Sequence, residues 1–86
     1  MKKVTIMLSN INDVKLFVNT VSRFDFDVDL ISGRYVVDAK SIMGIFSLDL
    51  SSPIDMEVRS DDCDEFLKLI DSFIVKSSFQ PEIQVS

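Results

Sequence analysis

Between Phe24 and Leu30, apolar and acidic residues alternate without interruption, and this pattern limits the possible folds more than any other in the sequence. Neighbouring side chains of a β-strand point to opposite faces of the sheet, so strict alternation predicts a strand with one dry and one wet face. Such a strand favours an antiparallel sheet that helices cover on one face only. The apolar positions are Phe24, Phe26, Val28 and Leu30, and the acidic ones are Asp25, Asp27 and Asp29.

The rest of the chain supplies six further elements in the predicted order β-α-β-β-α-β-α. Strands are predicted over residues 4–8, 35–39 and 54–58, and helices over 14–21, 41–48 and 62–73. Ser32-Gly33-Arg34 predicts a tight hairpin connection, because glycine readily takes the positive φ of such turns. Asp62 and Glu65 have the spacing of a capping box for the last helix, whose buried stripe is predicted to be Phe66, Leu69, Ile70 and Phe73. Periodicity alone also allows a ferredoxin-like arrangement.

The 86 residues are enough for one domain, predicted over residues 1–76, with a loose polar tail over 77–86. The net charge of −5 disfavours direct binding of nucleic acid. The longest uncharged apolar stretch, Ile42 to Leu48, is too short to span a membrane, so a cytoplasmic location is expected. A flat strand would spread the three aspartates instead of converging them, so we expect no metal site and no cofactor. Cys63, the only cysteine, lies among acidic residues that disfavour a thiolate, and we interpret it as unreactive.

The segment Lys40-Ser41-Ile42-Met43-Gly44-Ile45-Phe46-Ser47-Leu48, preceded by Phe26 to Leu30, resembles HPr, the small phosphocarrier of the sugar phosphotransferase system. The resemblance runs from about Val14 to Phe73. It implies an α+β open-faced sandwich, in which a four-stranded antiparallel sheet is covered on one face by three helices. It therefore favours this arrangement over the ferredoxin-like one.

Phosphate-carrying members of this family use a histidine at the start of the first helix, followed by alanine, arginine and proline. The present sequence contains no histidine. Counting back from Ser41 without gaps places Asn10 at the histidine position, Asn12 at the arginine position and Asp13 at the proline position. An amide is neither a nucleophile nor a cation, so phosphotransfer in the usual form is excluded and no catalytic residue is predicted.

The resemblance implies a second phosphate site at Ser41. In HPr proteins of low-GC Gram-positive bacteria, HPr kinase/phosphorylase phosphorylates the serine of this motif, and the phosphorylated form binds a LacI-type transcription regulator. In this family the second helix also contacts partner proteins, which makes Lys40, Ile42, Met43 and Phe46 the predicted docking residues. The sequence is thus similar to catabolite-repression HPr paralogues that lack the histidine, and a non-enzymatic regulatory protein is predicted, either monomeric or weakly dimeric.

Two other interpretations remain open at the level of sequence. The chain could be a constitutive interaction module that binds a protein through the same residues or through the bare face of its sheet, without phosphorylation. A more remote alternative is a phosphocarrier with an unorthodox acceptor, for which Ser9 is the only hydroxyl in the loop. The structural alternatives are that Ser41 only caps its helix and that the apolar residues after it belong to the core.

Overall fold

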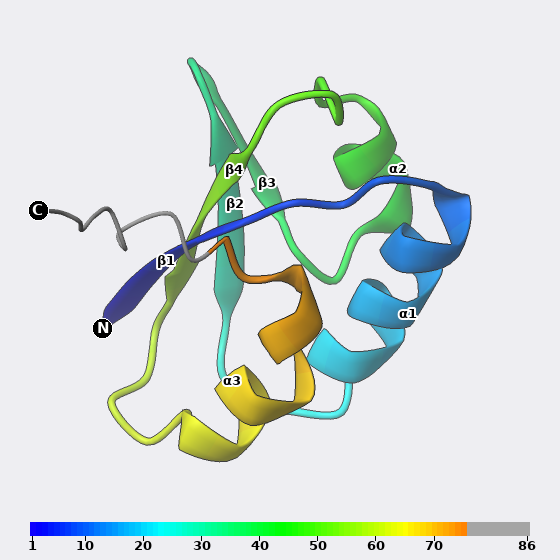
Figure 1. Cartoon of the computed structure of the whole chain (residues 1–86). Helices are drawn as coiled ribbons and strands as arrows, with labels where there is room; N and C mark the ends of the chain where they lie inside the picture. Colours follow the sequence, from blue (N-terminus) through cyan, green and yellow to red (C-terminus); the bar gives the residue numbers. More distant parts are fainter. Residues whose placement is uncertain (76–86) are drawn as a thin grey trace, which may run out of the picture.

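The computed structural model describes residues 1–75, and within them four strands form one antiparallel sheet (Figure 1). The strands are β1 (Lys2–Ile6), β2 (Val28–Ser32), β3 (Tyr35–Asp38) and β4 (Ile54–Val58). Their order across the sheet is β1-β4-β2-β3, and each neighbouring pair is antiparallel. The predicted tail over 77–86, and Lys76 at the predicted domain end, lie outside the described residues.

The helices all lie on one side of this sheet, as Figure 1 shows. They are α1 (Ile11–Val21), α2 (Ile42–Phe46) and α3 (Asp64–Leu69), which is followed by a short 3-10 turn, η1 (Asp71–Phe73). The opposite side of the sheet, called the open face below, is left uncovered by these helices. The predicted open-faced sandwich and its element order are therefore confirmed.

The core lies between the sheet and the helices, where the apolar positions of each strand meet those of α1 and α3. In α1, Val14, Phe17 and Val21 are fully buried and Val18 is half-buried, as the helical spacing predicted. The ring of Phe17 packs edge-on against Phe73, with 6.1 Å between centroids, and so connects α1 to η1. The other fully buried large side chains are Ile6, Leu8, Val28, Leu30, Ile45, Ile54, Met56, Val58, Phe66 and Ile70.

The alternating segment points its side chains as predicted, but only part of it is a strand. The strand β2 begins at Val28, and the chain before it forms turns and bends. A strand needs hydrogen bonds to a neighbouring strand, and those from the β3 and β4 sides end at Val28 and Asp27. The last of these backbone bonds run from Ala39 N–H to the Val28 carbonyl and from Arg59 N–H to the Asp27 carbonyl, each at 2.9 Å. Prediction of a strand back to Phe24 was wrong for this reason.

Phe24 and Phe26 instead close the end of the core. Their rings stack with 5.3 Å between centroids, and each packs against the ring of Phe66 in α3, at 5.3 and 5.5 Å respectively. Such offset and edge-to-face arrangements are favoured for aromatic rings. The inward direction of both phenylalanines was thus predicted correctly, while the backbone that carries them is irregular.

The last helix also departs from the prediction. Leu69 is 47% exposed, and Leu67 packs half-buried against the core in its place. The buried stripe follows the spacing i, i+3, i+4, i+7 from Cys63 through Phe66 and Leu67 to Ile70. The helix itself begins at Asp64, two residues later than predicted. The N-cap is Cys63, without a side-chain cap bond, so the predicted capping box at Asp62 and Glu65 is wrong.

The strand β1 lies two residues earlier than predicted, because β4 begins opposite Ile6. The end of β1 also pairs with the segment from Phe73 to Val75, where Ile6 and Ile74 form an isolated antiparallel bridge. Met7 N–H donates to the Phe73 carbonyl at 2.8 Å, and Val75 N–H donates to the Thr5 carbonyl at 2.8 Å. The end of the described chain is therefore anchored to β1. At the other end of the sheet the predicted hairpin is confirmed, with Gly33 at a φ of 60°.

Candidate functional site

Ser41, the predicted phosphorylation site, lies on the surface at the start of α2. It is the N-cap residue of this helix, and its Oγ accepts a hydrogen bond from Gly44 N–H at 3.1 Å. Its own N–H donates to the Asp38 carbonyl at 2.9 Å, which holds it one tight turn from β3. Its side chain is exposed. A hydroxyl in this place caps the helix and is at the same time open to a modifying enzyme.

Gly44 allows α2 to lie this close to β3. A Cβ atom at position 44 would lie 3.1 Å from Ser41 Oγ and 3.3 Å from the Cβ of Val37, closer than ordinary van der Waals contact. A larger residue would therefore press on both the capping hydroxyl and the strand. The glycine of the Lys-Ser-Ile-Met-Gly segment thus has a packing role that also keeps Ser41 in its capping geometry.

The apolar residues of α2 divide between core and surface. Ile45 and Leu48 are buried, and Ile42 packs half-buried against the core. Met43 is 75% exposed and Phe46 is 39% exposed. Of the apolar docking residues predicted from sequence, two therefore present side chains to solvent beside Ser41, while Ile42 contributes mainly to packing. We call Met43 and Phe46 the α2 patch.

Lys40, the fourth predicted docking residue, has a structural contact. Its Nζ donates to the Phe24 carbonyl at 2.9 Å, and its side chain is half-buried. Its backbone N–H donates to Asp38 Oδ1 at 2.9 Å. Lys40 therefore joins the loop before α2 to the irregular segment before β2, and its ammonium group is already engaged by the protein.

Asn10, the residue aligned with the histidine position in the sequence analysis, is the N-cap of α1. Its Oδ1 accepts from Asp13 N–H at 2.9 Å, and Asp13 Oδ2 accepts from Ser9 N–H at 3.0 Å. Both side chains thus accept backbone N–H groups at the helix start. The arrangement differs from a capping box in that Asp13 binds the N–H of Ser9 and not that of the N-cap residue. The loop presents an amide and a carboxylate, which can stabilise a helix start but offer neither a nucleophilic nitrogen nor a cation for phosphate.

The sequence analysis did not single out two exposed apolar residues of α1. Ile11 is 59% exposed and Leu16 is 58% exposed. The helical spacing could have predicted their exposure, since neither residue belongs to the buried stripe of Val14, Phe17 and Val21. The helix that carries them contacts α2, so the helical layer has apolar surface on both of these elements.

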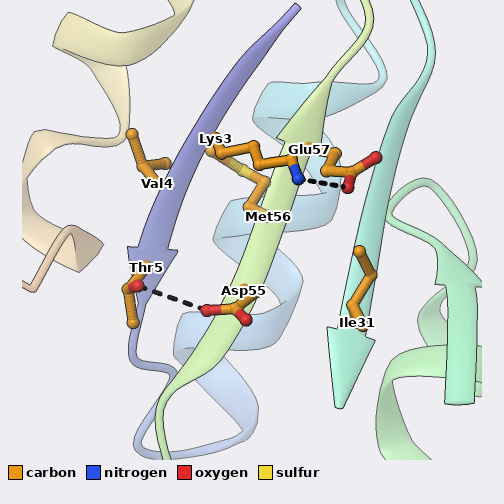
Figure 2. Close-up of a pocket in the computed structure, with 7 residues that line it drawn as sticks. All are labelled: Lys3, Val4, Thr5, Ile31, Asp55, Met56 and Glu57. Atoms are coloured by element: carbon orange, nitrogen blue, oxygen red, sulfur yellow. Dashed lines mark hydrogen bonds and ion pairs between the residues drawn. The ribbon is translucent and has the colours of Figure 1, made fainter. Parts of the chain in front are cut away.

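The open face of the sheet is lined mainly by paired polar residues (Figure 2). Lys3 Nζ lies 3.5 Å from Glu57 Oε2, and Thr5 Oγ1 donates to Asp55 Oδ1 at 3.3 Å. These side chains border a shallow hollow of 280 Å³, which Ile31 also lines. No group of three or more histidine, cysteine or acidic residues suited to a metal ion occurs within residues 1–75.

Of the three aspartates in the alternating segment, Asp25 and Asp27 are exposed ahead of β2, and Asp29 lies on the open face. Arg59 Nη2 donates to Asp29 Oδ2 at 2.8 Å, and this pairing raises the pKa of Arg59. The aspartates therefore do not converge on one point.

Cys63 is 2% exposed at the start of α3. Burial is the main cause that raises the pKa of its thiol, the charge of Lys2 acts in the opposite direction, and the charge of Asp64 adds to the rise. The sequence analysis interpreted Cys63 as unreactive because of its acidic neighbours, whereas in the structure burial is the main cause.

We expect Cys63 in the folded protein to react with a thiol reagent at pH 7.4 at least about 100-fold more slowly than in urea-unfolded protein. Only the thiolate is nucleophilic, and both the raised pKa and the burial limit its reaction. The rate is measured by the increase in intact mass over time. Equal rates in the folded and unfolded protein would contradict the burial of this residue.

Comparison with known proteins leads to the same family that the fold and the sequence motif indicate. Residues 12–75 match the family model described as the PTS HPr component phosphorylation site. The fold and this match define a chain of the HPr class, and the protein belongs to the HPr family of the phosphotransferase system. No curated protein matches the sequence significantly.

Solved structures of the same class are similar to this chain over most of its length. HPr-C-His from Thermoanaerobacter tengcongensis is 34% identical, with a TM-score of 0.72, over 96% of this chain and 100% of that one. The phosphocarrier protein HPr from Bacillus anthracis strain Ames is 31% identical, with a TM-score of 0.65, over 86% and 94%. A Mycoplasma histidine-containing phosphocarrier protein, 15% identical with a TM-score of 0.68 over 83% and 89%, shares the fold.

Within residues 1–75, no helix has both the length and the apolar character needed to cross a membrane.

Proposed function

We propose that this protein is a non-enzymatic regulatory member of the HPr family, which binds a partner protein under the control of phosphorylation at Ser41. The observation that carries the proposal is the exposed Ser41 hydroxyl at the N-cap of α2, beside the exposed side chains of the α2 patch, in a chain without histidine. The family offers this serine as its other phosphate site. A cytoplasmic location, with no cofactor, belongs to the same proposal.

Phosphorylation would change this surface strongly. A phosphoserine carries a charge of about −1.5 to −2 at neutral pH and three strong acceptor oxygens. On Ser41 it would lie at the backbone N–H groups of the first turn of α2, where Gly44 N–H already donates to the hydroxyl. A partner could then bury the apolar α2 patch and pair its own cations with the phosphate beside it. This combination suits an interface that depends on phosphorylation.

The first test is incubation with HPr kinase/phosphorylase and ATP, followed by intact mass measurement. We expect the wild-type chain to gain the mass of one phosphate and the Ser41→Ala variant to gain none. Ser47→Ala is a matched control, because Ser47 is exposed at the other end of the same helix and its hydroxyl donates to the Gly44 carbonyl at 2.6 Å. An unmodified wild type, or equal modification of Ser41→Ala, would remove the regulatory proposal.

The second test measures binding to an immobilised LacI-type regulator. We expect the phosphorylated chain to bind at least about tenfold more tightly than the unphosphorylated chain, and Met43→Ser to weaken the phosphorylated complex about tenfold or more. Leu69→Ser is the matched control, since Leu69 is an exposed apolar residue on α3. Equal binding with and without phosphate would instead favour a constitutive interaction module.

A further inference from the structure

The strand β3 forms an outer edge of the sheet and carries exposed apolar side chains there. In the order β1-β4-β2-β3 it pairs with β2 on one side, and no strand among residues 1–75 pairs with its other side. Tyr35 is 70% exposed and Val36 is 62% exposed. An exposed apolar edge strand is a template for pairing with another strand.

The backbone hydrogen bonds show which groups of β3 point outward. Ala39 N–H donates to the Val28 carbonyl at 2.9 Å, so the backbone polar groups of Ala39 face β2. In an antiparallel pair this direction alternates along the strand, so Tyr35 and Val37 also face β2. The polar groups of Val36 and the N–H of Asp38 therefore point away from the sheet, toward any added strand.

We propose that β3 pairs antiparallel with β3 of a second copy of this chain, with Val36 opposite Val36. Two residues can exchange hydrogen bonds across the new pair only if the backbone N–H and C=O groups of both point away from β2. This condition excludes every second register. Only the register centred on Val36 also places Arg34 of each copy opposite Asp38 of the other. The strand is thus self-complementary in charge as well as in hydrogen bonding.

The side chains agree with this register. Val37 lies opposite the buried Leu30 and faces the helices, so Val36 and Asp38, its neighbours in β3, are on the open face. Arg34 is exposed in the hairpin turn directly before β3, and the pairing of the two copies would extend to it. Val36 lies next to Ile31 of β2. In the paired copies, the Val36 side chain of each chain would therefore lie against the other Val36 and against Ile31 of its own chain. An Arg34–Asp38 pair of opposite charge would lie on each side of the two valines. Tyr35 would be covered by Val37 of the second copy.

The association is expected to be weak. The strand has four residues, which buries less area than the roughly 1,200 Å² of a stable interface, and each chain carries a net charge of −5. Sedimentation equilibrium in about 0.15 M salt, where repulsion beyond roughly 8 Å is screened, measures the mass directly. We expect it to rise from the 9.8 kDa of one chain toward twice that value between about 10 µM and about 1 mM protein.

Variants separate this interface from others. Val36→Lys should remain monomeric throughout this concentration range, whereas Val36→Thr, which keeps a β-branched residue, should still associate. Arg34→Asp and Asp38→Arg should each be monomeric alone, but an equimolar mixture should form a mixed dimer, because both cross-strand pairs then have opposite charges. Thermal melting of each variant confirms folding, since Asp38 also accepts the Lys40 N–H bond.

The proposal would be overturned by a monomeric wild type at about 1 mM, by association of Val36→Lys equal to that of wild type, or by loss of association in Met43→Ser instead. The last of these would show that the copies meet through the α2 patch. Mass increasing beyond two chains would also contradict it, because one edge pairing closes on itself about a two-fold axis.

Discussion

Replacement of Phe66 by alanine is expected to lower the free energy of unfolding by about 3–5 kcal/mol. Phe66 is fully buried in α3 and contacts the rings of both Phe24 and Phe26, so its removal opens a cavity and leaves two aromatic contacts unmade. A domain of this length is expected to have a total stability of only about 4–13 kcal/mol. The loss is therefore a large part of the whole, measured by urea unfolding followed by circular dichroism.

Leu69→Ala is the matched control for this prediction. Leu69 lies on the same helix but is 47% exposed, and alanine is a better helix former, so we expect a loss of less than about 1 kcal/mol. The difference between the two variants also tests which residues of α3 are buried, because the spacing in the sequence had predicted both Phe66 and Leu69 in the core. Similar losses for the two variants would show that Leu69 is packed as the simple periodicity suggested.

The second large effect concerns phosphate transfer from phosphoenolpyruvate. With enzyme I, we expect the wild-type chain to take up no acid-labile phosphate, because Asn10 and Asp13 provide no imidazole and add a negative charge at the helix start. The triple variant Asn10→His, Asn12→Arg, Asp13→Pro is expected to take up phosphate. It supplies the nucleophile and the cation and removes the carboxylate, and proline is tolerated in a first helical turn.

The double variant Asn12→Arg, Asp13→Pro is the control that lacks only the nucleophile, and we expect it to take up none. Uptake by the double variant or by the wild type would instead support the unorthodox acceptor, which Ser9→Ala would then test directly. A folded triple variant that takes up no phosphate would contradict the alignment of Asn10 with the histidine position. Intact mass before and after acid treatment measures each outcome.

The candidate site was predictable from sequence to different degrees. The place of Ser41 at the start of α2 followed from local spacing, because a serine before an apolar run caps a helix through its own backbone neighbours. The exposure of Met43, as opposed to Ile42, depends on how α2 is rotated against β3, which the close approach at Gly44 sets. The engagement of Lys40 Nζ by the Phe24 carbonyl joins residues 16 positions apart and has no local signal.

From the sequence, the element order, the alternating directions of side chains in the strands, the family resemblance and the lack of an imidazole could be predicted. These are local or compositional properties, since periodicity reports the direction of each side chain from its immediate backbone. Three features came from contacts between distant segments instead: β2 begins at Val28, Leu67 is packed where Leu69 was expected, and the outer edge of β3 has no partner strand among residues 1–75. Each of these depends on where a partner strand or helix ends, and hydrogen bonds and packing between distant segments set those limits.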